Sequence, residues 1–207
     1  MMPVSEVLHQ QGYSLDYALN HQDLIPFVKK YLFKKNRFTI AFLILNLLFV
    51  AAWLFLSIYY GFGKTLSVGH IVSCSTFGIV IAILLAPLHE LLHGAAYRLC
   101  GAPVVSYKAN WKKLYFMAIA DQFITGRKAF YFIGAIPFVV ISLGMLLLAV
   151  FAEPWQQVMW LTVLWVHASM CAGDFGLMSY FAEHGHRNVI TYDDADNSIS
   201  YFYSRDL

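Results

Sequence analysis

The chain has 207 residues, of which 59% are hydrophobic and 13% are charged, and its formal net charge is +2. Soluble globular domains carry about 25% charged residues, so this composition indicates a membrane protein. The small net charge argues against a nucleic-acid-binding protein, and three widely spaced cysteines argue against a disulfide framework or a CxxC site. The N-terminal residues lack the basic start and apolar core of a cleavable signal peptide, so we expect targeting through internal helices.

Four segments are long and apolar enough to cross a bilayer, which requires about 20 residues. They are Phe38 to Tyr60, His70 to Leu99, Ala129 to Phe151, and Trp155 to Phe181. Five Lys or Arg residues precede the first segment and five separate the second from the third, whereas the other two connections hold only Lys64 between them. The positive-inside rule therefore places both termini in the cytoplasm. We expect a cytoplasmic segment at 1–37, a four-helix membrane domain at 38–181 and a cytoplasmic tail at 182–207.

The polar segments carry weaker signals. Residues 22–37 predict either a basic amphipathic helix on the inner leaflet or an ordinary juxtamembrane flank. The alternation from Val105 to Trp111 predicts a strand, which Lys112-Lys113 would turn into a second strand over 114–120. The tail suggests another hairpin around Asp193 to Asn197. The predicted fold class is an all-α polytopic membrane protein with four transmembrane helices, a small β-hairpin between the second and third, and a candidate C-terminal hairpin.

The motif His89-Glu90-Leu91-Leu92-His93 lies near the end of the second predicted span. On a helix, residues i and i+4 lie on one face about 6 Å apart along the axis, so His89 and His93 can bind one metal ion together. Glu90 lies beside that face, where it can take a proton from an attacking water. This spacing is a known zinc metallopeptidase signature. The alternative is a structural polar pair in the core of a helix bundle.

Catalytic zinc takes three protein ligands, so a third ligand must come from elsewhere in the chain. Asp174 is the only carboxylate inside the first, third or fourth predicted span. His89 precedes Arg98 by nine residues, and Asp174 precedes Glu183 by nine, so both lie about 13–14 Å from the cytoplasmic boundary. The two groups can therefore meet at one depth. The alternative for Asp174 is a polar contact or a helix-breaking role.

Other polar residues near this level have less defined roles. His167 precedes Asp174 by two helical turns, so it could donate to Asp174, stabilise an oxyanion, or be an unrelated buried histidine. Glu183, His184 and His186 could be spare ligands, although a solvated cluster at the helix exit is the simpler interpretation. Glu153 belongs to the outer loop and is a poor ligand candidate.

These motifs resemble the integral-membrane zincin peptidases of the DUF3267 type, which are similar to the site-2 protease group. The resemblance covers about residues 68–180 and rests on "HELLHGAAYRLCGAPVVSY", on "GAIPF" at 134–138, and on Gly173-Asp174. It implies that His89, His93 and Asp174 hold zinc and that Glu90 is the general base. The chain departs from the site-2 pattern in having Asp174-Phe175-Gly176 instead of Asp-Gly, with His167 as the candidate for the usual Asn position. It also lacks a PDZ insertion.

The sequence therefore predicts a zinc-dependent peptidase in a bacterial cytoplasmic membrane, acting on a membrane-protein or peptide substrate with no role for nucleic acid. An extended substrate could pair with the strand near Val105 to Trp111. The alternative is a non-proteolytic zinc-binding membrane protein, against which Glu90 argues, because a purely structural metal site has no need of it. A metal transporter would require polar residues in the outer halves of the helices, which are nearly devoid of them.

Overall fold

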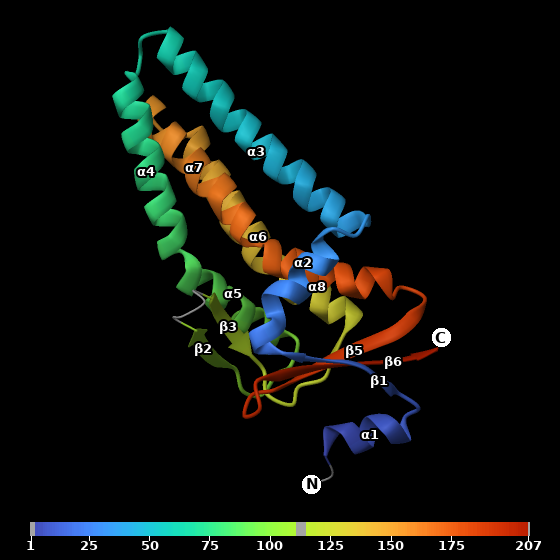
Figure 1. Ribbon diagram of the computed structural model, residues 1–207. Coiled ribbons are helices and arrows are strands. Elements are labelled where there is room, and N and C mark those ends of the chain that lie inside the picture. Colours follow the sequence, from blue (N-terminus) through green and yellow to red (C-terminus); the bar gives the residue numbers. More distant parts are fainter. Residues whose placement is uncertain (1–2, 111–114, 207) are drawn as a thin grey trace. The chain divides into compact units, whose positions relative to one another are not determined.

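The computed structural model describes residues 3–110 and 115–206, and the chain divides into two compact units. The helical unit comprises Ile40–His89 and Pro137–Ala172. The sheet unit comprises the described parts of Met1–Thr39, Glu90–Ile136 and Gly173–Leu207. Each unit is therefore assembled from segments that lie far apart in the sequence (Figure 1).

The long apolar helices belong mainly to the helical unit. They are α3 (Arg37–Phe62), α4 (Val68–Leu84), α6 (Arg127–Val150) and α7 (Pro154–Met170). Among the described residues, α3, α6 and the stretch from α4 through α5 (Ala86–Leu99) are each long and apolar enough to cross a membrane. A fourth span exists if α7 and α8 (Ala172–Glu183) act together. Three to four such helices support a membrane protein.

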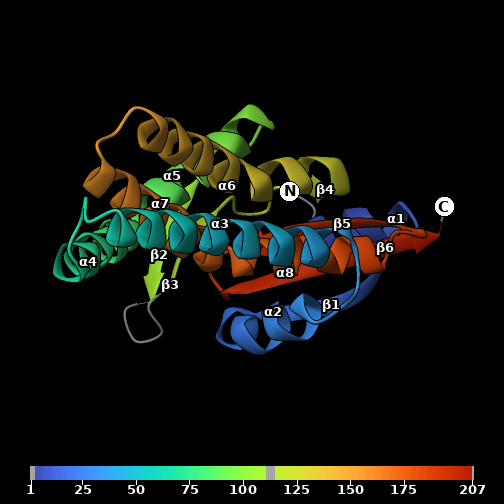
Figure 2. The same ribbon diagram turned by 90° about the horizontal axis from the view of Figure 1, so that it is seen from above.

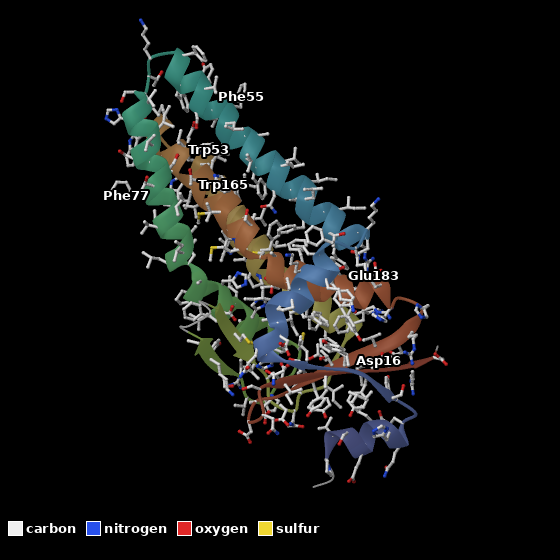
Figure 3. The ribbon with its side chains drawn as sticks, viewed as in Figure 1. Asp16, Trp53, Phe55, Phe77, Trp165 and Glu183 are labelled. Atoms are coloured by element: carbon white, nitrogen blue, oxygen red, sulfur yellow. The ribbon has the colours of Figure 1, made fainter. Side chains whose placement is uncertain are left out.

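The helical unit is held together by small residues and by side-chain hydrogen bonds between its helices. Helix α4 lies against α7 (Figure 2). At this contact, Gly78 lies close to Thr162. Trp53 of α3 donates its indole N–H to Ser75 Oγ of α4 at 3.3 Å and lies near Trp165 of α7 (Figure 3). Large apolar side chains elsewhere on these helices are exposed, as lipid-facing surfaces require.

The sheet unit contains a four-stranded antiparallel sheet in the order β1-β6-β5-β4. Its strands are β1 (Ser14–Asn20), β4 (Thr125–Gly126), β5 (Arg187–Asp194) and β6 (Ile199–Asp206). A separate two-stranded sheet pairs β2 (Ser106–Asn110) with β3 (Tyr115–Ile119), with Tyr107 opposite Ala118. The remaining elements of this unit are α1 (Val4–Gln10), the 3₁₀ turn η1 (His21–Asp23) and α2 (Leu24–Leu32).

The four-stranded sheet is covered on both faces because its strands alternate between two cores. On one face, Val189 and Phe202 pack with α2 and α8. On the other face, Ile190 and Tyr203 pack with Leu8 of α1. Figure 1 shows α2 and α8 on one side of the strands and α1 on the other.

The helical content and the small antiparallel sheets agree with the fold class predicted from the sequence, but the sheet is larger than expected. Strands β1 and β4 were not predicted, and β1 makes part of the N-terminal segment integral to the sheet. In α2, Phe27 and Tyr31 are buried in the protein core. The predicted turn at Lys112-Lys113 lies outside the described residues.

The predicted second span is divided at Leu85, where α4 ends and α5 begins. Pro87 explains the break, because a proline inside a helix lacks an N–H and clashes with the carbonyl four residues earlier. The fourth predicted span is likewise interrupted at Cys171, between α7 and α8. Both interruptions lie next to residues of the predicted site.

Candidate metal centre

Helix α5 carries the whole His-Glu-x-x-His motif and is anchored within the sheet unit after Glu90. Ala96 and Tyr97 pack in a buried cluster with Ala120 of the loop after β3 and Ile133 of α6. Gly94 leaves room for the side chain of Tyr107 from β2, whose hydroxyl oxygen would lie 2.0 Å from a Cβ at this position. The motif is therefore fixed between α6 and the β2–β3 sheet.

His93 has both ring nitrogens engaged within the sheet unit. Its Nδ1 donates to the backbone carbonyl oxygen of Ile133 at 2.9 Å, which orients the ring. Its Nε2 lies 3.1 Å from Oδ1 of Asp174, a residue in the first turn of α8. Both side chains are largely buried, with 11% and 16% of their surfaces exposed. The structure thus brings together two of the three predicted ligands, from helices separated by some eighty positions.

This pair fits the donor chemistry of zinc. Imidazole nitrogen and carboxylate oxygen each bind Zn²⁺ at about 2.0–2.1 Å, so two such ligands of a tetrahedral ion lie about 3.3 Å apart. The 3.1 Å between His93 Nε2 and Asp174 Oδ1 is close to that separation. A zinc-binding histidine also typically donates its other N–H to a carbonyl or carboxylate, which is the role of the bond to Ile133.

Glu90 faces a strand. Its Oε2 accepts a hydrogen bond from the backbone N–H of Ala118 in β3 at 2.7 Å. Because the N–H of Ala118 donates to Glu90, it points away from the partner strand β2. Glu90 therefore contacts the outer edge of β3, on the side of the two-stranded sheet away from β2. The candidate general base therefore lies at the edge of a short strand.

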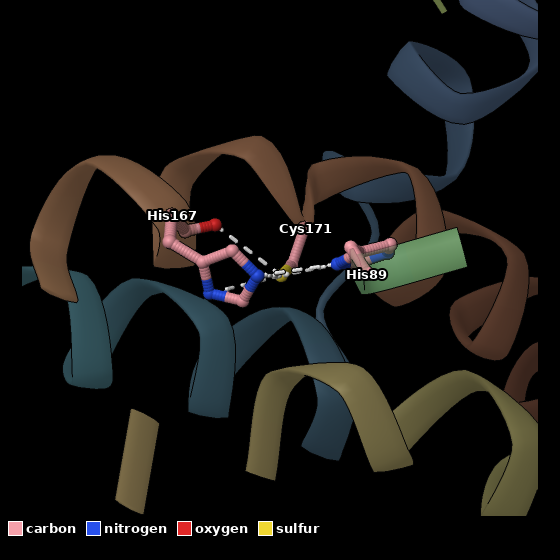
Figure 4. A group of neighbouring side chains, drawn as sticks. All are labelled: His89, His167 and Cys171. Carbon is pink, nitrogen blue, oxygen red and sulfur yellow. Dashed lines mark hydrogen bonds between the residues drawn. The ribbon is translucent and has the colours of Figure 1, made fainter. Parts of the chain in front are cut away.

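His89 and His167 are close together within the helical unit. The Nδ1 atom of His89 lies 3.2 Å from Nε2 of His167, and the Sγ atom of Cys171 lies 4.0 Å from His89 Nδ1 and 3.9 Å from His167 Nε2 (Figure 4). His167 and Cys171 are almost wholly buried, whereas His89 is partly exposed. The structure thus places His167 beside His89, a residue of the His-Glu-x-x-His motif.

Among the described residues, two groups of three side chains offer ligand atoms within 4.8 Å of one another. The first is His89, Glu90 and His93 on the single helix α5, and the second is His89, His167 and Cys171. Both groups contain His89. The motif spacing predicts the first group, whereas the second depends on the packing of α4 beside α7 within the helical unit.

The polar residues at the end of α8 have structural partners. Glu183 accepts a hydrogen bond from Asn36 Nδ2 at 2.9 Å, and His184 Nδ1 donates to the carbonyl oxygen of Tyr180 at 2.8 Å. Arg127 donates to the backbone carbonyl of His184 at 3.0 Å. These contacts fix the exit of the helix at Glu183 and His184.

The family model of DUF3267, described as "Putative zincin peptidase", matches residues 82–187. The chain belongs to the DUF3267 family. The match begins before the His-Glu-x-x-His motif and extends past Asp174, so it includes every side chain of both groups described above. Comparison with curated proteins gave no match to this DUF3267 protein, and comparison with solved structures gave none.

Two parts of the centre were not identified from the sequence. Cys171 follows His167 by one helical turn, and this i, i+4 spacing was the available signal. The backbone N–H of Ala118 had no sequence signal, because any residue other than proline supplies the same donor. Tertiary packing alone brings it to Glu90.

Proposed function

We propose that this protein is a zinc-dependent membrane peptidase in which His89, His93 and Asp174 hold zinc and Glu90 is the general base. The observation that carries the proposal is the His93–Asp174 pair, which has the separation expected of two zinc ligands and is oriented by the Ile133 carbonyl. The family description, which names zincin peptidases, supports the same activity.

Zinc, when bound, would supply a Lewis acid that polarises water and the substrate carbonyl. Glu90 takes the proton from the attacking water and passes it to the leaving amine. The hydrogen bond from Ala118 holds the Glu90 carboxylate in place for both transfers. His167 positions the His89 ring through Nδ1, which leaves Nε2 of His89 for the metal.

The substrate in this proposal is an extended segment of a peptide or membrane protein. The sequence favoured pairing along Val105 to Trp111, but the bond to Glu90 favours the outer edge of the partner strand β3. An added strand would lie about 4.8 Å from β3, and its scissile bond would pass beside Glu90. We place the reaction in or near a bacterial cytoplasmic membrane, with both termini cytoplasmic and lipid around the long helices.

The substitution Glu90→Gln tests the proposal. The amide retains an oxygen that accepts the Ala118 hydrogen bond but cannot accept the proton of water. We expect cleavage of a mixture of quenched fluorescent peptides in detergent micelles to fall by about 10²- to 10⁴-fold, the usual contribution of a general base. Zinc content should remain that of the wild type. The control Glu6→Gln, on the exposed surface of α1, should cleave normally.

Two outcomes would overturn this assignment. If Glu90→Gln cleaves peptides as fast as the wild type, Glu90 is not the base. If the zinc-loaded wild type cleaves no peptide of the mixture and no co-expressed membrane protein, the alternative holds, and the protein is a non-proteolytic zinc-binding membrane protein that acts by interaction.

A further inference from the structure

We propose that His89, His167 and Cys171 form a second ligand set, which binds a borderline or soft divalent metal such as Zn²⁺ and shares His89 with the His-Glu-x-x-His motif. The inference stands whether or not the protein proves to be a peptidase. It rests on a cluster of three side chains within the helical unit, of which the zincin motif uses only one.

The distances match those of a coordinated ion. Two imidazoles and one thiolate bound tetrahedrally to zinc have nitrogens about 3.3 Å apart and each nitrogen about 3.6 Å from sulfur, given bonds of about 2.0–2.1 and 2.3 Å. The observed separations are 3.2 Å for the two nitrogens and 3.9–4.0 Å for each nitrogen and Cys171 Sγ. A shift of a few tenths of an ångström therefore completes the set.

The chemistry of the donors selects the class of metal. A thiolate with two imidazoles suits zinc, cobalt or copper and disfavours magnesium and calcium, which prefer oxygen ligands. Binding replaces the thiol proton of Cys171 by a metal–sulfur bond, and the proton leaves to solvent. The thiol currently donates to the His167 carbonyl oxygen at 3.3 Å, and this bond is lost on binding. The partial exposure of His89 provides a face through which an ion can enter.

Sharing His89 makes the two sets competitors. Its Nδ1 faces His167 and Cys171, so the zincin set must use Nε2. A neutral imidazole carries its proton on one nitrogen and binds metal through the other, so His89 serves one set at a time. An ion held by His167 and Cys171 therefore withdraws His89 from the zincin set. The second set would therefore hold a metal ion in a position where the zincin set lacks its ligand His89.

Cobalt substitution tests the second set without any activity measurement, because a cobalt–thiolate bond produces a near-ultraviolet charge-transfer band. The full-length protein is purified in detergent and loaded with Co²⁺. In Asp174→Ala the zincin set lacks its carboxylate, so we expect the band to be present. Adding Cys171→Ser should abolish the band. It should also weaken Co²⁺ binding by more than about 10- to 100-fold, which is the usual cost of losing a residue that only hydrogen-bonds to a ligand.

The matched control is Cys74→Ser in the Asp174→Ala background. Cys74 is also a buried cysteine of the helical unit, but it lies in α4, and it should leave the band intact. His167→Gln, added to Asp174→Ala, is a second test that leaves the thiol in place and should also remove the band. Size-exclusion profiles and thermal unfolding verify that each variant is folded.

The proposal is wrong if folded Asp174→Ala shows no cobalt–thiolate band, or if the band survives Cys171→Ser. Loss of the band in Cys74→Ser would also refute it. None of these results depends on peptide cleavage. If the protein shows the band but cleaves no peptide, the second ligand set stands and the proposed function is wrong. If the protein cleaves peptides but shows no band, the proposed function stands and the second ligand set is wrong.

Discussion

Replacement of Gly78 by alanine tests how closely α4 and α7 must pack. A Cβ at Gly78 would lie 2.6 Å from Thr162 Cβ and 2.7 Å from the Met159 carbonyl oxygen. Carbon atoms normally approach to about 3.5–4.0 Å, so the helices must separate by about 1 Å. Neither contact atom can rotate away, because one is backbone and the other is a Cβ.

The expected cost combines two effects. Overpacking of a close contact costs about 1–3 kcal/mol, while alanine in place of glycine gains about 0.8–1.0 kcal/mol of helix propensity. The net loss is about 0–2 kcal/mol, which lowers the midpoint of thermal unfolding by up to about 8 °C in a protein of this size. Because α7 carries His167 and ends next to Cys171, the same separation should also weaken Co²⁺ binding by His89, His167 and Cys171.

The assay is thermal unfolding in detergent, followed by circular dichroism, with Gly144→Ala as the control. Apart from the nearby backbone of α6 and the two chain neighbours, no atom of the described residues lies within 4 Å of a Cβ at Gly144 of α6, so this variant gains propensity without a clash. Its midpoint should equal or exceed that of the wild type. If Gly78→Ala is as stable as Gly144→Ala, the argument from close packing between α4 and α7 fails.

Three further predictions concern the sheet unit. Ala118→Pro removes the backbone N–H that donates to Glu90, at an outer strand edge where proline is tolerated. Peptide cleavage should therefore fall at least about tenfold while the zinc content stays unchanged. Normal cleavage would contradict the role of this hydrogen bond. Burial raises the pKa of Asp193 to about 6, despite the hydrogen bond from Ser200 and with a smaller contribution from Asp121. Because the folded state then binds this proton more tightly than the unfolded state, whose pKa is about 3.8, the stabilisation is complete below pH 4 and is lost as pH rises through 6. Asp193→Asn should flatten unfolding midpoints measured between pH 4 and 7, and an unchanged profile would refute the assignment. Arg187 Nη1 lies 2.8 Å from Asp16 Oδ1, and this ion pair joins β5 to β1. Arg187→Gln should lower the free energy of unfolding, measured by chemical denaturation, by about 1–2 kcal/mol, because it leaves a mostly buried carboxylate without its cation. A change near zero would show that the ion pair is not stabilising.

The features predicted from the sequence were those encoded locally. The apolar runs indicated the membrane helices, and the His89–His93 spacing indicated the metal-binding face of α5, because both depend on neighbouring residues along one helix. Asp174 was identified by its chemistry, as a carboxylate in an apolar segment. The structure adds its 3.1 Å approach to His93, which a sequence pattern does not contain.

The features that were missed depend on long-range packing. Strand β1 does not alternate regularly, its pairing with β6 shifts register between Leu15 and Tyr17, and its partner lies almost the whole chain away. Likewise, Cys171 becomes a candidate ligand only through its closeness to His89, which depends on the packing of α4 beside α7. The interruption at Leu85 was readable in principle from Pro87, but the continuous apolar run outweighed it.

The most direct test of the central claim is the zinc content of the detergent-purified protein, measured by mass spectrometry for the wild type and for His89→Ala. Because His89 belongs to both ligand sets, its loss should remove or greatly weaken binding in either position. We predict about one zinc per wild-type chain and little in His89→Ala. A folded wild type that binds no zinc, or a variant that retains the full amount, would contradict the assignment of a zinc centre to this motif.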